Sequence, residues 1–250
     1  MSQKIESNDL SLEALFKDFY VVPDFQREYV WEPQHVERLL QDALDEFYDE
    51  KGSPMLDNEY FIGSIVSYRD STGVYHLIDG QQRMTTAYLT LCAIRDALLE
   101  LGVQPAEALK SEISDASLDP TTGDDVYRYR VVLQYEDSQN VLKEIAETPD
   151  SVDKIPETTA SVRHLLAAYR TIRDWLQANF RTEAPKIKAF MAAFTQRIKL
   201  IRIVTPNLSR ALKLFETIND RGLGLTAMDL LKNLLFMRVS ADAYPKLRDR

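Results

Sequence analysis

The chain has 250 residues, 45% of them hydrophobic and 28% charged, which is enough for one large domain or two small ones with a buried core. Its formal net charge of −9 at pH 7 argues against a protein that coats nucleic acid through a broad basic face, although a local groove is not excluded. No apolar run reaches the ~18 residues of a membrane helix and the amino terminus lacks a signal pattern, so we expect a cytoplasmic protein with no membrane partner.

In chain order, Ser11 has the position of an N-cap for a short first helix. The stretch Tyr20–Trp31 is too aromatic for a solvent loop and too rich in proline and charge for a central strand, so we expect a short strand and an ordered loop. Pro33 suits the first turn of the next helix, whose apolar residues form one stripe. Residues 51–59 should then form a loop.

Two interpretations of the aromatic loop are open. Such a surface can stack a base while the guanidinium of Arg27 holds a phosphate. Alternatively, the aromatic rings form a plug that packs the loop against the sheet, with Arg27 and Glu28 solvated. The alternating residues are the aromatic Phe25, Tyr29 and Trp31 and the polar Gln26, Arg27 and Glu28.

The segment Tyr60–Leu91 organises the rest of the chain. Two apolar, β-branched runs within it, the second of them Val74–Ile78, are separated by a short turn and predict a hairpin. The run Asp79-Gly80-Gln81-Gln82-Arg83 follows directly. Apolar residues then recur three or four positions apart, so Gly80 should mark a corner between a strand and a helix, with polar residues at the helix entrance.

This corner is where we expect chemistry. The first N–H groups of a helix have no intrahelical partner and favour a phosphate or a carboxylate. Asp79 could hold a metal or orient a water, Gly80 lets the backbone come close, and Arg83 offers a planar fork for phosphate, while the two glutamines offer amide donors and acceptors. A capped helix with a solvated first turn is the alternative, because one Asp-Gly at a helix start is a weak signal.

The middle of the chain has weaker patterns. Residues 104–125 are poor in hydrophobic residues and contain prolines and a glycine, so we expect a mobile connection. Alternation over 126–135 predicts a strand, and a short capped helix should follow as far as Ile145. A soft boundary should lie around 148–156.

Beyond this boundary the pattern turns helical. Apolar stripes predict helices over 162–176 and 187–198, then a buried strand over 200–204 and a further helix. Asn219–Leu225 should form a glycine-bearing loop, and a capping box at Thr226 should start a leucine-rich helix. The polar residues of this region could converge on a ligand or simply cap the helix ends: Asn219, Arg221, Asp229 and Lys232.

Several kinds of site have no support in the sequence. Cys92 is the one cysteine, and its apolar neighbours indicate a buried structural thiol. The three histidines lie far apart, without the spacing of metal ligands. There is no Walker-type glycine loop, Ser-His-Asp arrangement or internal repeat. The chain stops without a closing element, so we expect a fragment of a longer one.

Three separated segments carry a resemblance to a known family. They are Val22–Trp31, then Phe61–Ile65 with Asp79–Thr86, then Phe215–Gly222 with Asp229–Asn233. In this order they resemble the amino-terminal domain of GmrSD-type, DNA-modification-dependent restriction and phage-defence proteins, a domain related to ParB and sulfiredoxin. The likeness covers nearly all of residues 10 to 240, and the order of the segments makes it specific although each is modest alone.

The resemblance implies an α+β fold, with a small ParB/sulfiredoxin-like mixed sheet and surrounding helices, followed by a mainly helical part. Residues 1–150 would form the core that hydrolyses nucleoside triphosphates through Asp79–Arg83, and residues 151–250 the mainly helical part of the same domain. It also implies recognition of modified DNA and an HNH-type nuclease, joined to the carboxy terminus or separate. No histidine cluster of that kind is present, so we do not expect this chain to cut DNA.

The resemblance also implies roles for individual residues. Asp79 would hold Mg²⁺ or align the attacking water, and Arg83 would neutralise phosphate charge. The implied hydrolysis site comprises Asp79, Gln81, Gln82 and Arg83. The residues implied in nucleotide binding are Gly80, Gln26, Arg27, Thr85, Asn219, Arg221 and Lys232. Those implied in DNA contact are Arg27, Tyr29 and Trp31.

The rival hypothesis is a non-enzymatic module that reads modified DNA through the Phe25–Trp31 surface, in which the nucleotide is a regulatory ligand or absent. A third hypothesis, that the ParB-like fold is itself a nuclease, has no distinctive residue behind it. The sequence does not distinguish GTP from ATP as the substrate, and it leaves homo-oligomerisation open.

Overall fold

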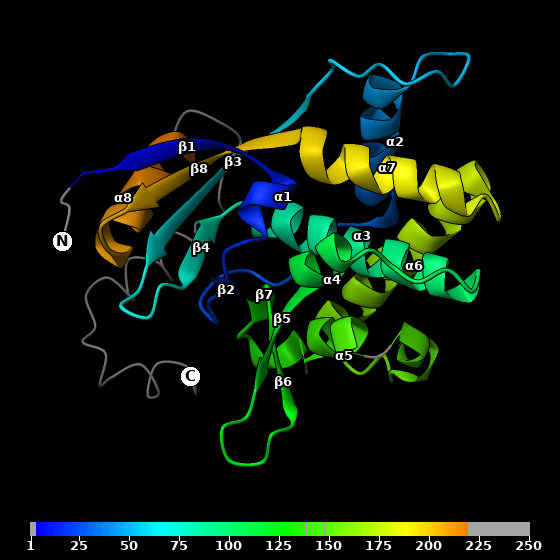
Figure 1. Cartoon of the computed structure of the whole chain (residues 1–250). Helices are drawn as coiled ribbons and strands as arrows, with labels where there is room; N and C mark the ends of the chain where they lie inside the picture. The colour runs from blue at the N-terminus through cyan, green and yellow to red at the C-terminus, as the bar shows by residue number, and fades with distance from the viewer. Residues whose placement is uncertain (1–3, 139, 148, 220–250) are drawn as a thin grey trace.

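The computed structural model describes residues 4–138, 140–147 and 149–219 (Figure 1). The strands are β1 (Glu6–Ser11), β2 (Tyr20–Val22), β3 (Tyr60–Arg69), β4 (Tyr75–Asp79), β5 (Ser114–Leu118), β6 (Asp125–Tyr129), β7 (Val131–Leu133) and β8 (Ile198–Thr205). The helices are α1 (Leu12–Leu15), α2 (Pro33–Phe47), α3 (Gln81–Glu100), α4 (Glu107–Ile113), α5 (Val141–Glu147), α6 (Ala160–Phe180), α7 (Ala184–Arg197) and α8 (Leu208–Asn219).

Six strands form one mixed sheet in the order β1-β8-β3-β4-β2-β7, and β5 pairs with β6 in a separate hairpin. β8 pairs in parallel with β3 and antiparallel with β1, so a strand from the last part of the chain lies inside the sheet. β2 runs parallel to both β4 and β7. The predicted α+β class, with a mixed sheet and surrounding helices, is therefore confirmed.

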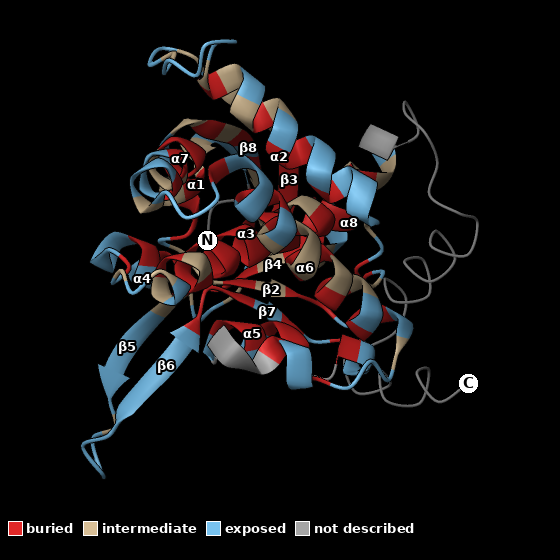
Figure 2. Ribbon diagram, turned by 90° about the vertical axis from the view of Figure 1, so that its right-hand side faces the viewer, coloured by how far each residue is buried: buried red, intermediate tan, exposed pale blue. Residues whose placement is uncertain are grey.

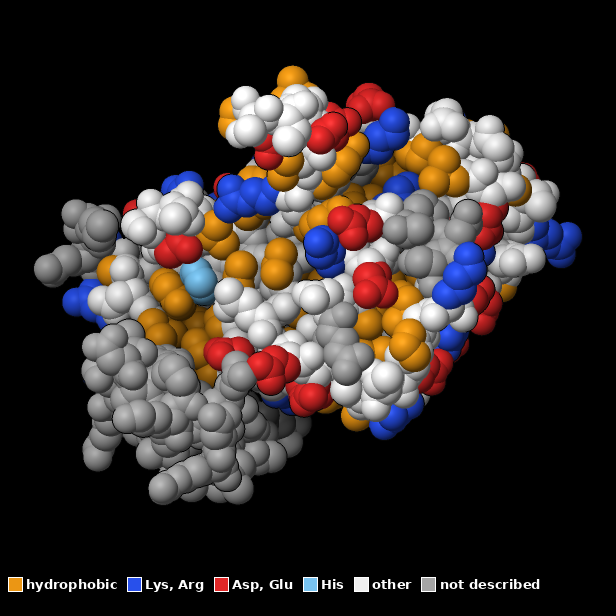
Figure 3. Space-filling view, turned by 90° about the horizontal axis from the view of Figure 1, so that it is seen from below, with side chains coloured by type: hydrophobic (Ala, Val, Ile, Leu, Met, Phe, Trp, Pro, Cys, Tyr) orange, Lys and Arg blue, Asp and Glu red, His pale blue; other side chains and the backbone are white. Residues whose placement is uncertain are grey.

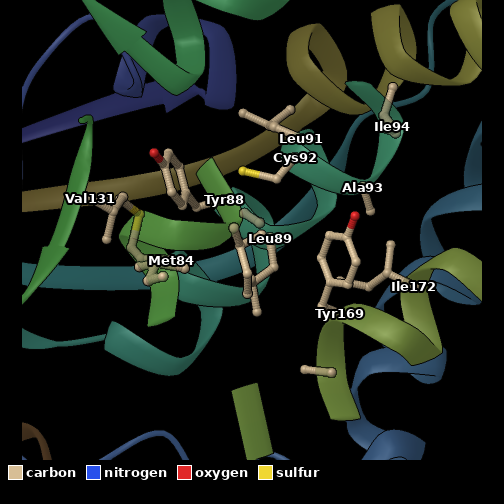
Figure 4. Packing of buried hydrophobic residues seen from close by; sticks show 14 of the residues in the cluster. Met84, Tyr88, Leu89, Leu91, Cys92, Ala93, Ile94, Val131, Tyr169 and Ile172 are labelled. Atoms are coloured by element: carbon tan, nitrogen blue, oxygen red, sulfur yellow. The ribbon is translucent and has the colours of Figure 1, made fainter. Parts of the chain in front are cut away.

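The helix α3 lies at the centre of the fold, with α6 along its side (Figure 1). Residues on every side of it are buried, including Thr86 and Thr90, whose hydroxyls donate to carbonyls one turn earlier in the same helix. The sequence predicted one apolar face, and the structure corrects this to an enclosed helix. Figure 4 shows this packing for Met84, Tyr88, Leu89, Cys92 and, from α6, Tyr169 and Ile172.

The helix α8 covers the opposite face of the sheet. Successive residues of a strand point to opposite faces, so Ile65 of β3 enters the main core and Val66 enters a smaller cluster with α8. The same smaller cluster contains Ile78 of β4, Phe25 of the loop after β2, and Phe215 of α8. The sheet thus separates two apolar layers, and the aromatic loop contributes to the smaller one.

Several predicted boundaries are confirmed. Ser11 caps α1 by accepting a hydrogen bond from Ala14 N at 3.2 Å, and Pro33 begins α2. The β3–β4 hairpin leads into α3, and α6, α7 and β8 lie where the later apolar stripes predicted them. Cys92 is buried, as expected. None of the described helices is long and apolar enough to cross a lipid bilayer.

The prediction of a mobile connection over 104–125 is wrong, because this region contains α4 and β5. β5 and β6 form a hairpin that projects from the body and is exposed over most of its length (Figure 2). β5 lacks the apolar alternation that marks a half-buried strand, so the sequence pattern missed it, whereas most of β6 lies within the strand predicted over 126–135. The single strand expected over 126–135 is divided at Arg130, whose guanidinium donates to the carbonyls of Ser111 and Lys17.

Candidate functional site

The candidate site lies at one edge of the sheet, where strand ends and a helix start meet. β2, β4 and β7 are parallel, so their carboxyl ends lie together. α3 begins directly after β4, which brings its unpaired first N–H groups to the same edge. Ligands, and anions in particular, bind at such places because strand ends and a helix start leave polar backbone groups open.

Gly80 forms the corner between β4 and α3. Its φ is +84°, in the left-handed region that favours glycine, and a Cβ at this position would lie 2.5 Å from Ile65 Cγ2. Asp79 Oδ1 accepts a hydrogen bond of 2.7 Å from Gly80 N. The predicted corner is confirmed, and Gly80 rather than Asp79 occupies the N-cap position.

Arg83 is held against β3. Its Nη1 donates to Ile62 O at 3.0 Å, and its Nη2 lies 4.0 Å from Asp79 Oδ2. Gly63 makes this approach possible, because a Cβ there would lie 2.2 Å from Arg83 Nη1. The side chains of Arg83 and Asp79 remain 28% and 24% exposed, so a guanidinium and a carboxylate are accessible side by side at the sheet edge.

The two glutamines of the motif differ in their surroundings. Gln82 Oε1 accepts from Val30 N at 2.9 Å, and Gln82 Nε2 donates to Glu28 O at 2.9 Å. Its amide therefore clamps the aromatic loop to the start of α3, with both polar atoms engaged inside the chain. Gln81 is also buried, but no hydrogen bond of its side chain is found within the described part of the chain.

Two aromatic side chains of the loop are buried, which favours the plug over the stacking surface for these two residues. Tyr29 is 1% exposed, its Oη lies 2.8 Å from Thr86 Oγ1, and its backbone N donates to Tyr135 Oη at 3.2 Å. Burial raises the pKa of the Tyr29 phenol, so it stays neutral. Phe25 packs under α8. Both rings fit the plug interpretation, and the burial of Tyr29 does not support its predicted contact with DNA.

The remaining polar and aromatic residues of the loop lie closer to solvent or carry an unused group. Arg27 is exposed, and Trp31 is half-buried and stacks on His35 with ring centroids 6.1 Å apart. Gln26 is 6% exposed, and its Nε2 has no hydrogen-bond partner among residues 4–138, 140–147 and 149–219. A buried amide donor of this kind costs stability unless a ligand or water accepts from it. Gln26 therefore offers an unused donor in the loop that passes over the site.

The third segment of the family resemblance begins at Phe215, in α8, which packs near this edge of the sheet. Phe215 packs with Phe25 and Ile78, which places the last turns of α8 near the end of β4. α8 ends at Asn219, whose side chain is not described, and Arg221 and Lys232 lie outside the described residues. Thr85 is buried inside the fold, so its predicted contact with a nucleotide is not supported by exposure.

Sequence reasoning missed Ile62 and Gly63 as residues that shape the candidate site. Both belong to the Phe-Ile-Gly run that marked the resemblance, but neither side chain carries reactive chemistry. Their contribution is a backbone carbonyl and an empty space, which together fix the position of Arg83. A glycine inside an apolar strand pattern was the available signal, since it indicates a bulge or the close approach of another group.

The charges on the face shown in Figure 3 are mixed. Lysine and arginine side chains there form separate small groups, interspersed with acidic and apolar ones, rather than one continuous basic area. This distribution agrees with the acidic composition of the chain.

Comparison with family models gives a match over most of the chain. A family model described as "GmrSD restriction endonuclease, N-terminal domain" matches residues 8–236. This range includes the aromatic loop, the β3–β4 hairpin, the corner at Gly80 and α8. A search of curated proteins found no match.

Proposed function

Because the chain belongs to the family of the GmrSD restriction endonuclease N-terminal domain, we propose that it hydrolyses a nucleoside triphosphate within a DNA-modification-dependent restriction or anti-phage system. The observation that carries this proposal is the pairing of Arg83 with Asp79 at the start of α3. A cation, a carboxylate and free helix N–H groups are together suited to a phosphate chain and an attacking water.

Each group has a distinct role in the proposed reaction. The terminal phosphate lies against the α3 entrance, where Arg83 compensates the negative charge that develops on its oxygens. Asp79 Oδ1 accepts from Gly80 N, and Asp79 Oδ2, which lies 4.0 Å from Arg83 Nη2, orients the water. Attack of this water on the terminal phosphorus breaks the bond to the bridging oxygen and releases inorganic phosphate and the nucleoside diphosphate.

The residues at this edge fit Mg²⁺ bound together with the nucleotide. Within the described ranges no group of three or more acidic, histidine or cysteine side chains forms a dedicated metal site, and Asp79 is the carboxylate at the corner. Mg²⁺ commonly takes one or two carboxylates, with phosphate oxygens and waters completing its coordination. When bound, it would neutralise phosphate charge, with Asp79 as its protein ligand.

Gln26 and Arg27 complete the proposed nucleotide site from the loop. Gln26 Nε2 is an unused buried donor, and Arg27 offers an exposed guanidinium one residue later. Gln82 does not contact the nucleotide in this scheme. Its role is indirect, because its amide holds the loop that carries these two residues. Gln81 remains a proposed contact of the phosphate chain at the helix entrance.

The test is phosphate release from GTP and from ATP with Mg²⁺, by the wild type and by Asp79→Asn. This variant keeps an oxygen to accept from Gly80 N but removes the carboxylate charge, so a folded and inactive protein supports the proposal. Asp115→Asn, in the projecting hairpin, is the matched control. Normal hydrolysis by Asp79→Asn would remove Asp79 from the mechanism. Adding modified and unmodified duplex DNA identifies the signal to which hydrolysis is coupled, and adding an HNH-type nuclease partner tests that coupling.

A DNA-reading module without hydrolysis is the second candidate, favoured by the exposure of Arg27 and the partial exposure of Trp31. It predicts salt-sensitive DNA binding that survives Asp79→Asn and fails with Arg27→Ala. Tyr29 is left out of this test because its ring is buried.

A further inference from the structure

Phe61 is an aromatic residue that the fold leaves in solvent. It is the second residue of β3 and 56% of its surface is exposed. Tyr60 and Ile198, which pair across β3 and β8, both pack on the main core, so the next pair, Phe61 and Lys199, points to the opposite face of the sheet. A phenylalanine in this position gains nothing from core burial.

α8 does not cover this part of the sheet face. It packs farther along β3 and β8, where Val66 and Ile203 belong to the smaller cluster. On β8 the residue Ile201, which pairs with Ser64, is likewise 37% exposed. The open half of the face therefore begins at Phe61, at the end of β3 that belongs to the candidate site.

The pairing of β3 with β8 shifts by one residue between Phe61 and Ser64, and this bulge in β3 links Phe61 to Arg83. Arg83 Nη1 donates to the carbonyl of Ile62, the residue after Phe61, and Gly63 leaves space for the guanidinium. The exposed ring and the partly exposed guanidinium are thus fixed to adjacent points of one strand. On β8 the residue that pairs with Phe61 is Lys199, whose Nζ forms an ion pair with Glu59 Oε1 at 3.2 Å.

This arrangement has the two chemical parts that a nucleotide needs. The phosphates are anionic and match Arg83 and the α3 entrance, while the base is flat and matches an exposed aromatic ring. We propose that Phe61 is the stacking platform for the base of the nucleoside triphosphate whose phosphates lie at Asp79 and Arg83. This inference rests on the proposed function.

Stacking on a phenylalanine accepts every base, because each base has an aromatic face and no hydrogen bond is read. Phe61 therefore strengthens the binding of ATP and GTP to a similar extent. It contributes nothing to the binding of inorganic tripolyphosphate, which has the same anionic chain but no base. This difference separates a stacking role from a general effect on the site.

The experiment measures the dissociation constants of ATP, GTP and tripolyphosphate, each with Mg²⁺, for the full chain and its variants. Phe61→Ala should weaken both nucleotides by about tenfold and leave tripolyphosphate unchanged. Phe61→Trp should keep or improve nucleotide affinity. Tyr127→Ala is the matched control, since Tyr127 is a strand aromatic with 52% exposure on the projecting hairpin, and it should behave as the wild type.

Two results would overturn the inference while the proposed function stands. One is a Phe61→Ala protein that binds nucleotides as the wild type does, including the case in which only DNA binding is weakened. The other is an equal loss for nucleotides and tripolyphosphate, which would mean that Phe61 acts by positioning Arg83. A wild-type protein that binds neither nucleotides nor tripolyphosphate would overturn the inference together with the proposed function.

Discussion

Gly63 and Arg83 fit together as a space and the group that fills it, since a Cβ on Gly63 would lie 2.2 Å from Arg83 Nη1. The glycine has a φ of +104°, which further disfavours any other residue. Its neighbour Ile62 supplies the carbonyl that receives the guanidinium at 3.0 Å. The bulge in β3 and the arginine of α3 are therefore one structural unit, although they belong to different parts of the motif set.

Replacing Gly63 by alanine should displace the Arg83 guanidinium from Ile62 O. Because a catalytic group misplaced by about 1 Å can lose roughly 100-fold in rate, we expect Gly63→Ala to reduce nucleotide hydrolysis to that extent. The measurement is phosphate release at saturating nucleotide, with the melting temperature recorded in parallel.

Gly102→Ala separates steric displacement from backbone strain. Gly102 has a φ of +70°, but no other group of the described residues lies within 4 Å of the point that an alanine Cβ would occupy, so its replacement costs strain of about 1 kcal/mol without a collision. It should lower the melting temperature and leave hydrolysis intact. Equal losses of activity in the two variants would show that the Gly63 effect is general destabilisation.

Alanine substitutions of the neighbouring glutamines, Gln81 and Gln82, should differ in their effect on the free energy of unfolding. Gln82→Ala should lower the free energy of unfolding by roughly 1–3 kcal/mol, because Val30 N and Glu28 O both lose a partner. Gln81→Ala should cost less than about 1 kcal/mol, since no side-chain hydrogen bond is found for it among the described residues. Urea titration measures both, and hydrogen exchange at Val30 should increase in the first variant alone. Equal costs would argue against the clamp.

The sequence predicted the hairpin, the corner at Gly80 and the helix after it, because these features have strong local signals. β-branched runs, a glycine and a repeat of three or four residues each depend on neighbours in the chain. The same local argument failed for β5, whose exposed residues bury too little apolar surface to produce a pattern.

The candidate site was predicted in part. Asp79 and Arg83 meet because they are four positions apart across the corner between β4 and α3, whereas the clamp from Gln82 to the aromatic loop joins residues more than fifty positions apart. Local pattern carries no information on such a contact. The burial of Tyr29 against Thr86 was missed for the same reason, because its partner comes from another element.

Arg83→Lys should show whether hydrolysis requires the planar guanidinium group of Arg83 and not only its positive charge. A lysine ammonium ends a single flexible stem and cannot face both Ile62 O and Asp79 with the geometry of a planar guanidinium. We expect hydrolysis to fall at least about tenfold while the melting temperature changes little. Arg83→Ala should then recover part of its rate when guanidinium ions are added at millimolar concentration. Full activity in Arg83→Lys would reduce the role of Arg83 to a point charge.

Glu112 of α4 makes the stability of the fold depend on pH. Burial raises the pKa of its carboxyl to about 7 from an ordinary value of 4.5, the charge of Glu13 adds to this shift, and Lys17 opposes it. Between these two pH values the folded protein keeps a proton that the unfolded chain has lost. Stability should therefore be highest below about pH 4.5 with respect to this group and fall as pH rises toward 7.

Glu112→Gln removes this dependence because its amide stays neutral. Its free energy of unfolding should exceed that of the wild type by up to about 3 kcal/mol at pH 8, and the two proteins should be nearly equal at acidic pH, where Glu112 is protonated in both states. Urea titrations at the two pH values measure the difference. Glu107→Gln, an exposed position on the same helix, should change stability little at either pH. A Glu112→Gln protein less stable than the wild type at pH 8 would mean that the buried carboxylate has a favourable partner in the folded state.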